Sequence, residues 1–259
     1  MNFYQINRLM KYSILMYNFN NYEILREPLE IDSNAEYIYV TDNKNLKSDK
    51  WKIIYDKRLE KMSVFEKCYY VRFHLFDYCT TNTCIYLDGS IQINRSLNTL
   101  YNNFIKSNSD IGLSINGCFN DLREDYSFWI KYRNYPKSNA DKCLYFLNLE
   151  KYDFNKKGYL ECNIRICKNT ELNKEIDERT YETLKFLGKP TIERFDQPIY
   201  SYIIQKYYNN IKVFCMSRNT VMSSYLTWCW HNTKNPRKAP IKTNKCYLFG
   251  KPVKLNDLV

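Results

Sequence analysis

The sequence has few glycines and histidines and no long apolar run. Its 259 residues include six glycines, seven prolines and two histidines. No segment approaches the roughly 18 uninterrupted apolar residues that a membrane-spanning helix needs. The first residues, MNFYQINRLMKYS, have neither the apolar core nor the small-residue cleavage site of a signal peptide. We therefore expect a cytoplasmic protein without a membrane span.

The cysteines do not form a metal-binding pattern. Ten cysteines are scattered along the chain, with Cys79/Cys84 and Cys162/Cys167 as the closest pairs, and no CxxC pair is present. This spacing argues against a structural zinc site and favours buried free thiols. The sequence also lacks internal repeats, low-complexity linkers and heptads, and its 44% apolar content is enough for one domain with a sizeable core.

Acidic residues are outnumbered by basic ones. The chain has 39 Lys and Arg against 28 Asp and Glu, a formal net charge of +11. This excess favours an anionic partner, which could be a nucleotide phosphate, a nucleic acid or an anionic lipid surface. The 25 tyrosines suit base stacking as well. Against a nucleic-acid-binding protein, the sequence shows no dense basic helix and no RNP-like aromatic motif.

Short apolar runs alternate with helical or loop segments. In the segment 61–78, apolar residues recur at three- and four-residue spacing, which predicts a helix with one buried face. Thr170 is a plausible N-cap for another helix, which Gly188 ends. Strands separated by such crossovers predict an α/β fold with a mainly parallel central sheet flanked by helices. The expected strands are 11–17, 36–42, 51–56, 84–88, 110–115, 159–167 and 213–216, and the remaining helices are 96–105 and 196–208.

Polar residues follow several of these strands. In a parallel α/β sheet, ligands bind at the carboxyl ends of the strands, so these residues are expected to gather at one edge. The set comprises Asn18, Asn20 and Tyr22 after the first strand, Asp42 after the second, Asp88 and Ser90 after the fourth, and Glu161 near the later sheet.

Asp88 follows the apolar run Cys84 to Leu87 and precedes Gly89 and Ser90. A carboxylate in such a setting is costly unless it is paired, hydrogen-bonded or bound to a cation. Mg²⁺ or Mn²⁺ bridging to a diphosphate would satisfy it, and Gly89 would allow phosphate to approach the backbone. Because Asp88 and Ser90 are two residues apart, their side chains are predicted to lie on the same side of an extended chain. The alternative is a simple Asp-Gly turn between two hairpin strands.

The segment YLDGSIQI, with VTDN upstream, resembles the nucleotide-sugar-binding half of GT-A glycosyltransferases, whose DxD motif follows such a strand. It is most similar to small bacterial and viral enzymes of the lipopolysaccharide type. The resemblance extends from about Lys11 to His231. It implies one GT-A (Rossmann-like) domain with a nucleotide-sugar-binding half (1–115), an acceptor-side half (116–230) and a basic tail (231–259) with seven Lys or Arg and one Asp.

The resemblance also assigns roles to individual residues in the donor site. Asp88 would bind Mn²⁺ or Mg²⁺ and the diphosphate, with Ser90 as a weaker ligand and His231 completing the metal site. Ser90 stands where the family motif has a second Asp, which makes metal dependence less secure. Around these, the nucleotide sugar would contact the backbone at Gly89 and the side chains of Asn18, Asn20, Tyr22, Asp42, Arg72, Lys234 and Arg237. For His231 alone, a surface or aromatic-packed histidine is the alternative, and His74 is expected to be structural.

Further residues are expected on the acceptor side. Glu161, Asp196 and Gln197 are the candidate catalytic residues. An inverting enzyme would use Glu161, or else Asp196, as its general base, whereas a retaining enzyme could use a front-face route assisted by a diphosphate oxygen, and the sequence leaves both open. Arg123, Glu124 and Asp125 resemble a segment that contacts the transferred sugar. Each has a structural alternative: a salt bridge for Glu161, a helix cap for Asp196, and a solvated helical face for residues 123–125.

The sequence therefore predicts a glycosyltransferase that moves a sugar from a nucleotide-diphosphate donor to an acceptor hydroxyl. The expected acceptor is a lipopolysaccharide or other lipid-linked glycan, which the basic tail would help the protein to reach at an anionic membrane surface. Two alternatives remain open. One is a nucleic-acid-binding protein. The other is a catalytically inactive glycosyltransferase-like scaffold, which is suggested by Ser90 in the position where the family motif has a second Asp.

Overall fold

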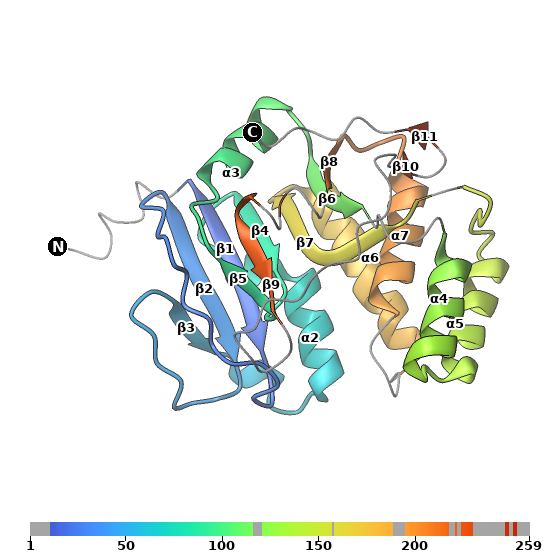
Figure 1. Cartoon of the computed structure of the whole chain (residues 1–259), viewed down its shortest axis with the longest axis horizontal. Coiled ribbons are helices and arrows are strands. Elements are labelled where there is room, and N and C mark those ends of the chain that lie inside the picture. The colour runs from blue at the N-terminus through green and yellow to red at the C-terminus, as the bar shows by residue number, and fades with distance from the viewer. Residues whose placement is uncertain are drawn as a thin grey trace.

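A seven-stranded mixed sheet forms the centre of the protein (Figure 1). The computed structural model describes residues 11–115, 121–156, 158–188, 195–217, 221, 224–229, 247–248 and 251–252. The strand order is β3-β2-β1-β4-β7-β6-β8. The strands are β1 (Tyr12–Asn18), β2 (Ala35–Thr41), β3 (Lys52–Tyr55), β4 (Thr83–Leu87), β6 (Ile111–Ile115), β7 (Leu160–Lys168) and β8 (Val213–Ser217).

The predicted mainly parallel sheet is confirmed, with one exception. β1 pairs in parallel with β2 and β4, β2 with β3, and β6 with β8. β7 is antiparallel to both of its neighbours, β4 and β6. Its sequence alternates polar residues (Glu161, Asn163 and Arg165) with apolar ones (Cys162, Ile164 and Ile166), and this alternation predicts the two sets on opposite faces without giving the direction of the strand.

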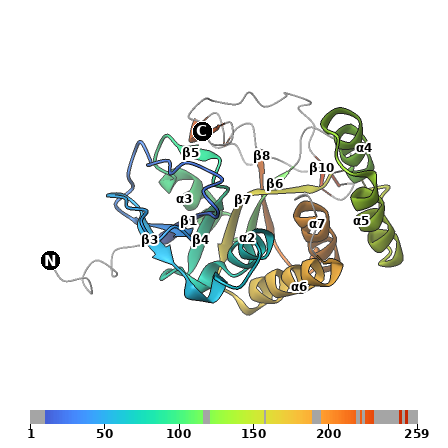
Figure 2. The ribbon, with the colours of Figure 1, turned by 90° about the horizontal axis from the view of Figure 1, so that it is seen from below.

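Helices cover both faces of the sheet (Figure 2). One face carries α2 (Val64–Phe73), α6 (Glu171–Leu187) and α7 (Asp196–Tyr207), and the other carries α3 (Asn98–Lys106). A pair of helices, α4 (Leu122–Arg133) and α5 (Lys137–Leu149), lies beside α7 at the far end of the sheet. Among the described residues, no helix has the length and apolar character needed to cross a membrane.

The helix ends follow local sequence signals. Thr170 accepts a hydrogen bond from the Asn173 amide at the start of α6, and Gly188 ends that helix with φ of 79°, as predicted. The predicted helix 61–78 was too long. α2 begins after a capping box formed by Ser63 and Glu66 and ends at Phe73, and a short 3₁₀ turn, η2 (Leu75–Asp77), follows.

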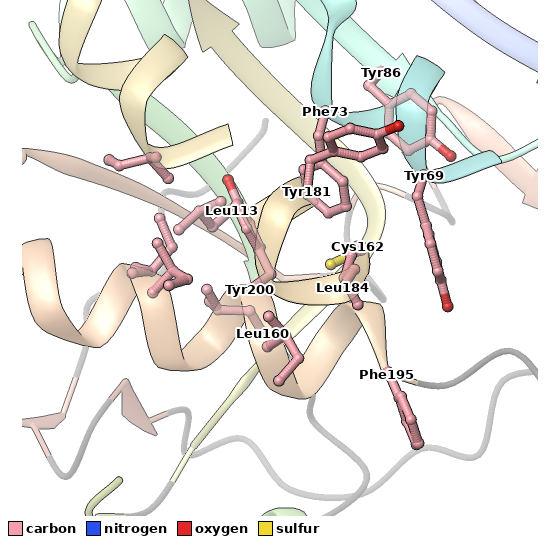
Figure 3. Packing of buried hydrophobic residues seen from close by; sticks show 14 of the residues in the cluster. Tyr69, Phe73, Tyr86, Leu113, Leu160, Cys162, Tyr181, Leu184, Phe195 and Tyr200 are labelled. Carbon is pink, nitrogen blue, oxygen red and sulfur yellow. The ribbon is translucent and has the colours of Figure 1, made fainter. Parts of the chain in front are cut away.

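Two apolar layers fill the space between the sheet and the helices, because successive residues of each strand face opposite sides. The layer under α2, α6 and α7 includes Phe73, Tyr86, Tyr181 and Tyr200, which Figure 3 shows gathered between helices and sheet. The layer under α3 is built from branched aliphatic and aromatic side chains, among them Ile14, Ile85, Phe104 and Phe214. The eight cysteines in the described ranges are free thiols, as expected.

A second, small sheet lies over the α3 face. β5 (Ile91–Ile93) pairs antiparallel with β9 (Leu226–Trp228), more than 130 residues later in the chain. The alternative of a turn between two strands at Asp-Gly is confirmed, because the dipeptide joins β4 to β5, but the two strands do not form a hairpin: β5 pairs with β9, and β4 pairs with β1 and β7. A further short pair is formed by β10 (Tyr247–Leu248) and β11 (Lys251–Pro252).

Candidate functional site

The sheet has a topological switch point between β1 and β4. From β1 the chain continues outward to β2 and β3, and it then returns through α2 to β4 on the other side of β1. The loops that follow β1 and β4 therefore leave in different directions at the carboxyl ends of these strands, the place where α/β proteins commonly bind ligands. Tyr17 and Asn18 end β1, and Asp88 follows β4.

The guanidinium of Arg72, from α2, lies at the ends of these strands and binds two carboxylates. Its Nη2 donates to Asp88 Oδ1 at 2.9 Å, and its Nη1 donates to Asp196 Oδ2. Asp88 follows β4 and Asp196 is the first residue of α7, so Arg72 connects three elements that are far apart in sequence. The side chains of Arg72 and Asp196 are 12% and 10% exposed, and that of Asp88 is 31% exposed.

Two buried tyrosines complete the cluster. Arg72 donates to the Tyr17 hydroxyl at 2.8 Å and to the Tyr86 hydroxyl at 3.1 Å, and the Tyr86 hydroxyl donates to Asp88 Oδ1 at 2.5 Å. Burial raises the pKa of both phenols well above the usual value for tyrosine, so both hydroxyls stay protonated. Burial also lowers the pKa of Arg72, but Tyr17, Tyr86 and the two carboxylates outweigh it and the net shift is upward. Arg72 is thus a permanent cation.

The segment that follows Asp88 is a tight turn and not extended backbone. The Ile91 amide donates to the Asp88 carbonyl at 3.0 Å, so the predicted placement of Asp88 and Ser90 on the same side of an extended chain is wrong. The turn is fixed to neighbouring strands on two sides. The Asp88 amide donates to the Asn163 carbonyl, and the Ser90 carbonyl accepts from the Cys229 amide, both at 2.9 Å. Ser90 is only 5% exposed.

Gly89 lies where no side chain fits. A Cβ atom at this position would lie 2.7 Å from the Tyr17 carbonyl oxygen and 3.4 Å from Glu23 Cγ. Because the first of these atoms belongs to a buried backbone, the strand end cannot move aside cheaply. The structure therefore gives a steric reason for glycine at this turn, next to its expected role of letting a phosphate approach.

We predict that Gly89→Ala lowers the free energy of unfolding by about 1–3 kcal/mol, as overpacked sites do. It should also speed hydrogen exchange of the amides of residues 88–93. Gly188→Ala is the control, because it strains a backbone conformation at the end of α6 (φ 79°, ψ 177°) that is nearly restricted to glycine, at a cost of about 1–3 kcal/mol. Unchanged exchange at residues 88–93 in Gly89→Ala would show that the turn tolerates the added methyl group.

The β1–β2 connection brings the predicted base and ribose contacts close to one another. Asn20 and Asn21 have φ of 55° and 50°, and the Tyr22 amide closes the turn onto the Phe19 carbonyl at 3.1 Å. Asp42 accepts from the Asn20 amide and from Lys67 Nζ, each at 2.8 Å. Tyr22 is 57% exposed, so its ring is accessible to solvent.

Asn18 has a structural partner. Its side-chain amide donates to the Glu23 carbonyl at 2.6 Å and accepts from the Glu23 amide at 2.9 Å. The buried Asn18 side chain therefore holds the start of the connection against the end of β1.

The candidate catalytic residues lie on two different elements. Glu161 is buried in β7, and Asn163 Nδ2 donates to its Oε2 at 3.3 Å. The capping alternative for Asp196 is wrong: Phe195 is the N-cap of α7 without a side-chain hydrogen bond, and the Asp196 carboxylate pairs with Arg72. Gln197 is the next residue of α7 and is half-buried.

Residues 123–125 lie on α4, in the helical pair beside the sheet (Figure 2). Arg123 and Glu124 are exposed, and the Arg123 guanidinium lies 4.3 Å from the centre of the Phe154 ring. Asp125 is only 5% exposed, so a fully solvated helical face does not describe it. A role for these three residues in sugar binding stays a prediction.

The remaining predicted residues, His231, Lys234 and Arg237, lie outside the described residues. Cys229, whose amide binds Ser90, precedes His231 by two positions in the sequence. Within the described ranges, no three His, Cys, Asp or Glu side chains converge to form a metal site. His74 lies at the opposite edge of the sheet, where it stacks on Tyr70 and contacts Glu178 at 3.0 Å, in line with a structural role.

Sequence reasoning missed several residues of this site. Tyr17 and Tyr86 belong to apolar strands and read as core aromatics, although the spacing of two between Tyr86 and Asp88 places both on one face of the strand. Lys67 was missed because it lies on a helix whose contact with Asp42 depends on packing. Arg26 and Glu23 lie in a connection without regular structure, and nothing in their spacing identifies them.

No protein-family model matches the chain, and no curated protein matches it. Comparison with solved structures finds similarity to the apo form of the glycosyltransferase GlyE of Streptococcus pneumoniae TIGR4, with 11% identity and a TM-score of 0.42 over 79% of this chain. The chain covers 45% of GlyE, less than half of its length. It is also similar to the galactosyltransferase LgtC in complex with donor and acceptor sugar analogues, with 11% identity and a TM-score of 0.42 over 79% of this chain and 73% of LgtC. A third similar structure is the apo form of mouse xyloside xylosyltransferase 1, with 10% identity and a TM-score of 0.43 over 80% of this chain and 85% of that one.

Proposed function

We propose that this protein is a GT-A glycosyltransferase that moves a sugar from a nucleotide-diphosphate donor to an acceptor hydroxyl. The observation that carries the proposal is the Arg72 cluster, in which one buried cation joins Asp88 and Asp196 at the switch point of the sheet. Carboxylates held in fixed positions by such a cation can accept from the hydroxyl groups of a sugar, and Asp88 can also hold a divalent cation that binds anionic oxygens. These are the groups that a nucleotide sugar presents on either side of its scissile bond.

The surroundings of the cluster support the same function. The exposed Tyr22 ring and the polar turn at Asn20 and Asn21 lie at the end of β1, on one flank of Asp88, where a base and ribose would bind. Glu161 and Asp196 lie on elements of the second half of the chain, on the other flank, where the transferred sugar and acceptor would bind. The donor would therefore lie across the ends of β1 and β4 with its diphosphate at Asp88.

A divalent cation fits this site through Asp88. Mg²⁺ and Mn²⁺ are commonly held by one or two protein carboxylates together with phosphate oxygens and waters. The Asp88 side chain is 31% exposed and precedes the turn at Gly89, which fits a ligand that approaches from solvent. Ser90 and His231 would add ligands in this proposal, and Lys234 and Arg237 would bind the diphosphate. The ion would supply positive charge to the departing diphosphate.

The protein's own residues would orient the donor and the acceptor. Arg72 would bind the donor while keeping Asp88 and Asp196 at fixed positions, which is the preorganisation that stabilises charge in a transition state. Asp196 is held by Arg72, so Glu161 is the first candidate for a general base and Asp196 the second. Gln197, next to Asp196 on α7, and the α4 residues Arg123 and Asp125 would contact the transferred sugar or the acceptor.

The acceptor is proposed to be a lipopolysaccharide or another lipid-linked glycan. The net charge of +11 and the basic segment 231–259 support contact with an anionic membrane surface from the cytoplasmic side. Vesicles with and without anionic lipid would measure this contact directly by co-sedimentation.

We predict that one nucleotide among UDP, GDP, CMP and dTDP raises the melting temperature of the protein only when Mn²⁺ is present. A ligand that binds the folded state alone stabilises by about 2.7 kcal/mol at 100 times its Kd, which is a shift of several degrees. The measurement is a thermal-shift panel with and without the metal.

Other outcomes of the same panel would favour the alternatives. Stabilisation by single-stranded oligonucleotides but by no nucleotide would favour a nucleic-acid-binding protein. Tight binding of the intact donor without its hydrolysis would favour an inactive scaffold.

A further inference from the structure

A buried arginine in the β1–β2 connection contacts the turn after Asp88. Arg26 is 3% exposed, and its Nη1 donates to the Gly89 carbonyl at 2.6 Å. The same nitrogen lies 3.0 Å from Glu23 Oε2 and 3.3 Å from the Ile24 carbonyl. Because the hydrogen bond to Gly89 has a charged donor, it is stronger than a bond between neutral groups.

The arginine is itself held in place. Its partner Glu23 is 7% exposed and is fixed to the end of β1 by the two hydrogen bonds of the Asn18 side chain. The backbone carbonyl of Arg26 accepts from Trp51 Nε1 at 3.0 Å. The end of β1 therefore holds the guanidinium through Asn18 and Glu23, and the buried Trp51 holds the backbone of Arg26.

This contact fixes the peptide plane between Gly89 and Ser90. In a planar trans peptide the carbonyl and the amide N–H point in opposite directions, so the Ser90 N–H points away from Arg26. The Asp88 amide is bound to Asn163 and the Ser90 carbonyl to Cys229, and the Tyr17 carbonyl leaves no room for the turn to shift toward β1. Of the contacts that hold the turn, the one from Arg26 has a charged donor and comes from the β1–β2 connection.

We propose that Arg26 is a positioning residue that holds the Asp88-Gly89-Ser90 turn in the conformation that binds the donor diphosphate. This inference rests on the proposed function. The Arg26–Glu23 pair is neutral as a unit, so it orients the turn without adding net charge beside the diphosphate. With Ser90 in place of a second carboxylate, donor binding depends more strongly on the exact orientation of Asp88 and of the backbone around Gly89.

The test compares Arg26→Lys with Arg165→Lys. Lysine keeps the charge but cannot reproduce the fixed fork that guanidinium offers to several acceptors. Arg165 is a matched control, because it is 0% exposed and donates to both oxygens of the buried Asp177 at 2.7 and 2.9 Å without contacting the turn. The measurements are the Kd for the nucleotide that wild type binds with Mn²⁺, and hydrogen exchange of residues 88–93 without ligand.

We expect Arg26→Lys to weaken nucleotide binding at least tenfold and to speed exchange at residues 88–93. Arg165→Lys should change the Kd less than twofold, even where its melting temperature falls by a similar amount. The double variant Glu23→Gln/Arg26→Gln removes both charges together, so no buried charge is left unpaired should Arg26→Lys fail to fold. It should show the same loss of binding.

Two results would overturn the inference and can be told apart. If wild type binds a nucleotide and the Arg26 variants bind it equally well, Arg26 has no positioning role and the proposed function stands. If wild type binds none of UDP, GDP, CMP and dTDP with Mn²⁺, the proposed function fails, and the role of Arg26 in donor binding fails with it.

Discussion

Asp88→Asn is expected to lower the rate of sugar transfer by about 100- to 1,000-fold, the usual effect of removing one group that stabilises transition-state charge. It should also abolish the metal-dependent part of nucleotide binding. The fold should survive, because the amide oxygen of asparagine can still accept from Tyr86 and Arg72. The measurements are donor hydrolysis or transfer rates and nucleotide Kd with and without Mn²⁺.

Asp77→Asn offers a closely matched control. Asp77 Oδ2 accepts from a tyrosine, Tyr70, at 2.6 Å and from an arginine, Arg58, at 2.9 Å, which are the same partner types that Asp88 has. It lies in η2, just before β4, at the opposite end of that strand. Activity and nucleotide binding should be unchanged in this variant. A loss of activity shared by both variants would indicate a general structural effect and would contradict the role of Asp88.

Arg72→Met is expected to lower the free energy of unfolding by about 3–5 kcal/mol, the cost of breaking a buried ion pair from one side. Methionine fills part of the space of the arginine stem but leaves Asp88 and Asp196 facing each other without a cation. The two tyrosine hydroxyls also lose a donor. Urea unfolding at neutral pH measures the change, and transfer activity should fall below detection.

Two further variants separate charge from packing at Arg72. Adding Asp196→Asn to Arg72→Met removes one of the uncompensated carboxylates and should restore part of the lost stability. Arg58→Met is the control, because Arg58 also binds two carboxylates, Asp56 and Asp77, but its side chain is 55% exposed. Its cost should be about 1 kcal/mol or less, because water screens such pairs. Equal losses in Arg58→Met and Arg72→Met would contradict the importance of burial at Arg72.

Part of the site could be predicted from the sequence because it depends on which residues directly follow each strand. Asp88 follows the continuous apolar strand β4, and Asn20 and Asp42 follow β1 and β2, so a parallel sheet must bring them to one edge. The contact between Asn20 and Asp42 agrees with that reasoning. The helix ends at Thr170 and Gly188 could be predicted for the same reason, since a helix cap involves only residues that are neighbours in the sequence.

The predictions from the sequence were wrong where one local pattern is compatible with two different structures. Asp-Gly-Ser after a strand is compatible with extended backbone and with a hairpin turn, and the structure has a turn whose following strand pairs with β9. Asp196 at the start of a helix is compatible with a cap and with an ion pair, and the distant Arg72 decides in favour of the ion pair. In both cases the deciding partner lies more than 100 residues away along the chain.

The sequence by itself determined the class of fold, the edge of the sheet where polar groups gather and the segment around Asp88, because periodicity and strand order are properties of neighbouring residues. Only the tertiary structure decided that β7 runs antiparallel between β4 and β6, that Arg72 joins Asp88 to Asp196, and that Arg26 holds the Gly89 carbonyl. These contacts join residues that are far apart in the sequence, so no local pattern predicts them. They form because a charged group that is buried in the folded protein needs a partner, and the fold decides which residue is close enough to be that partner.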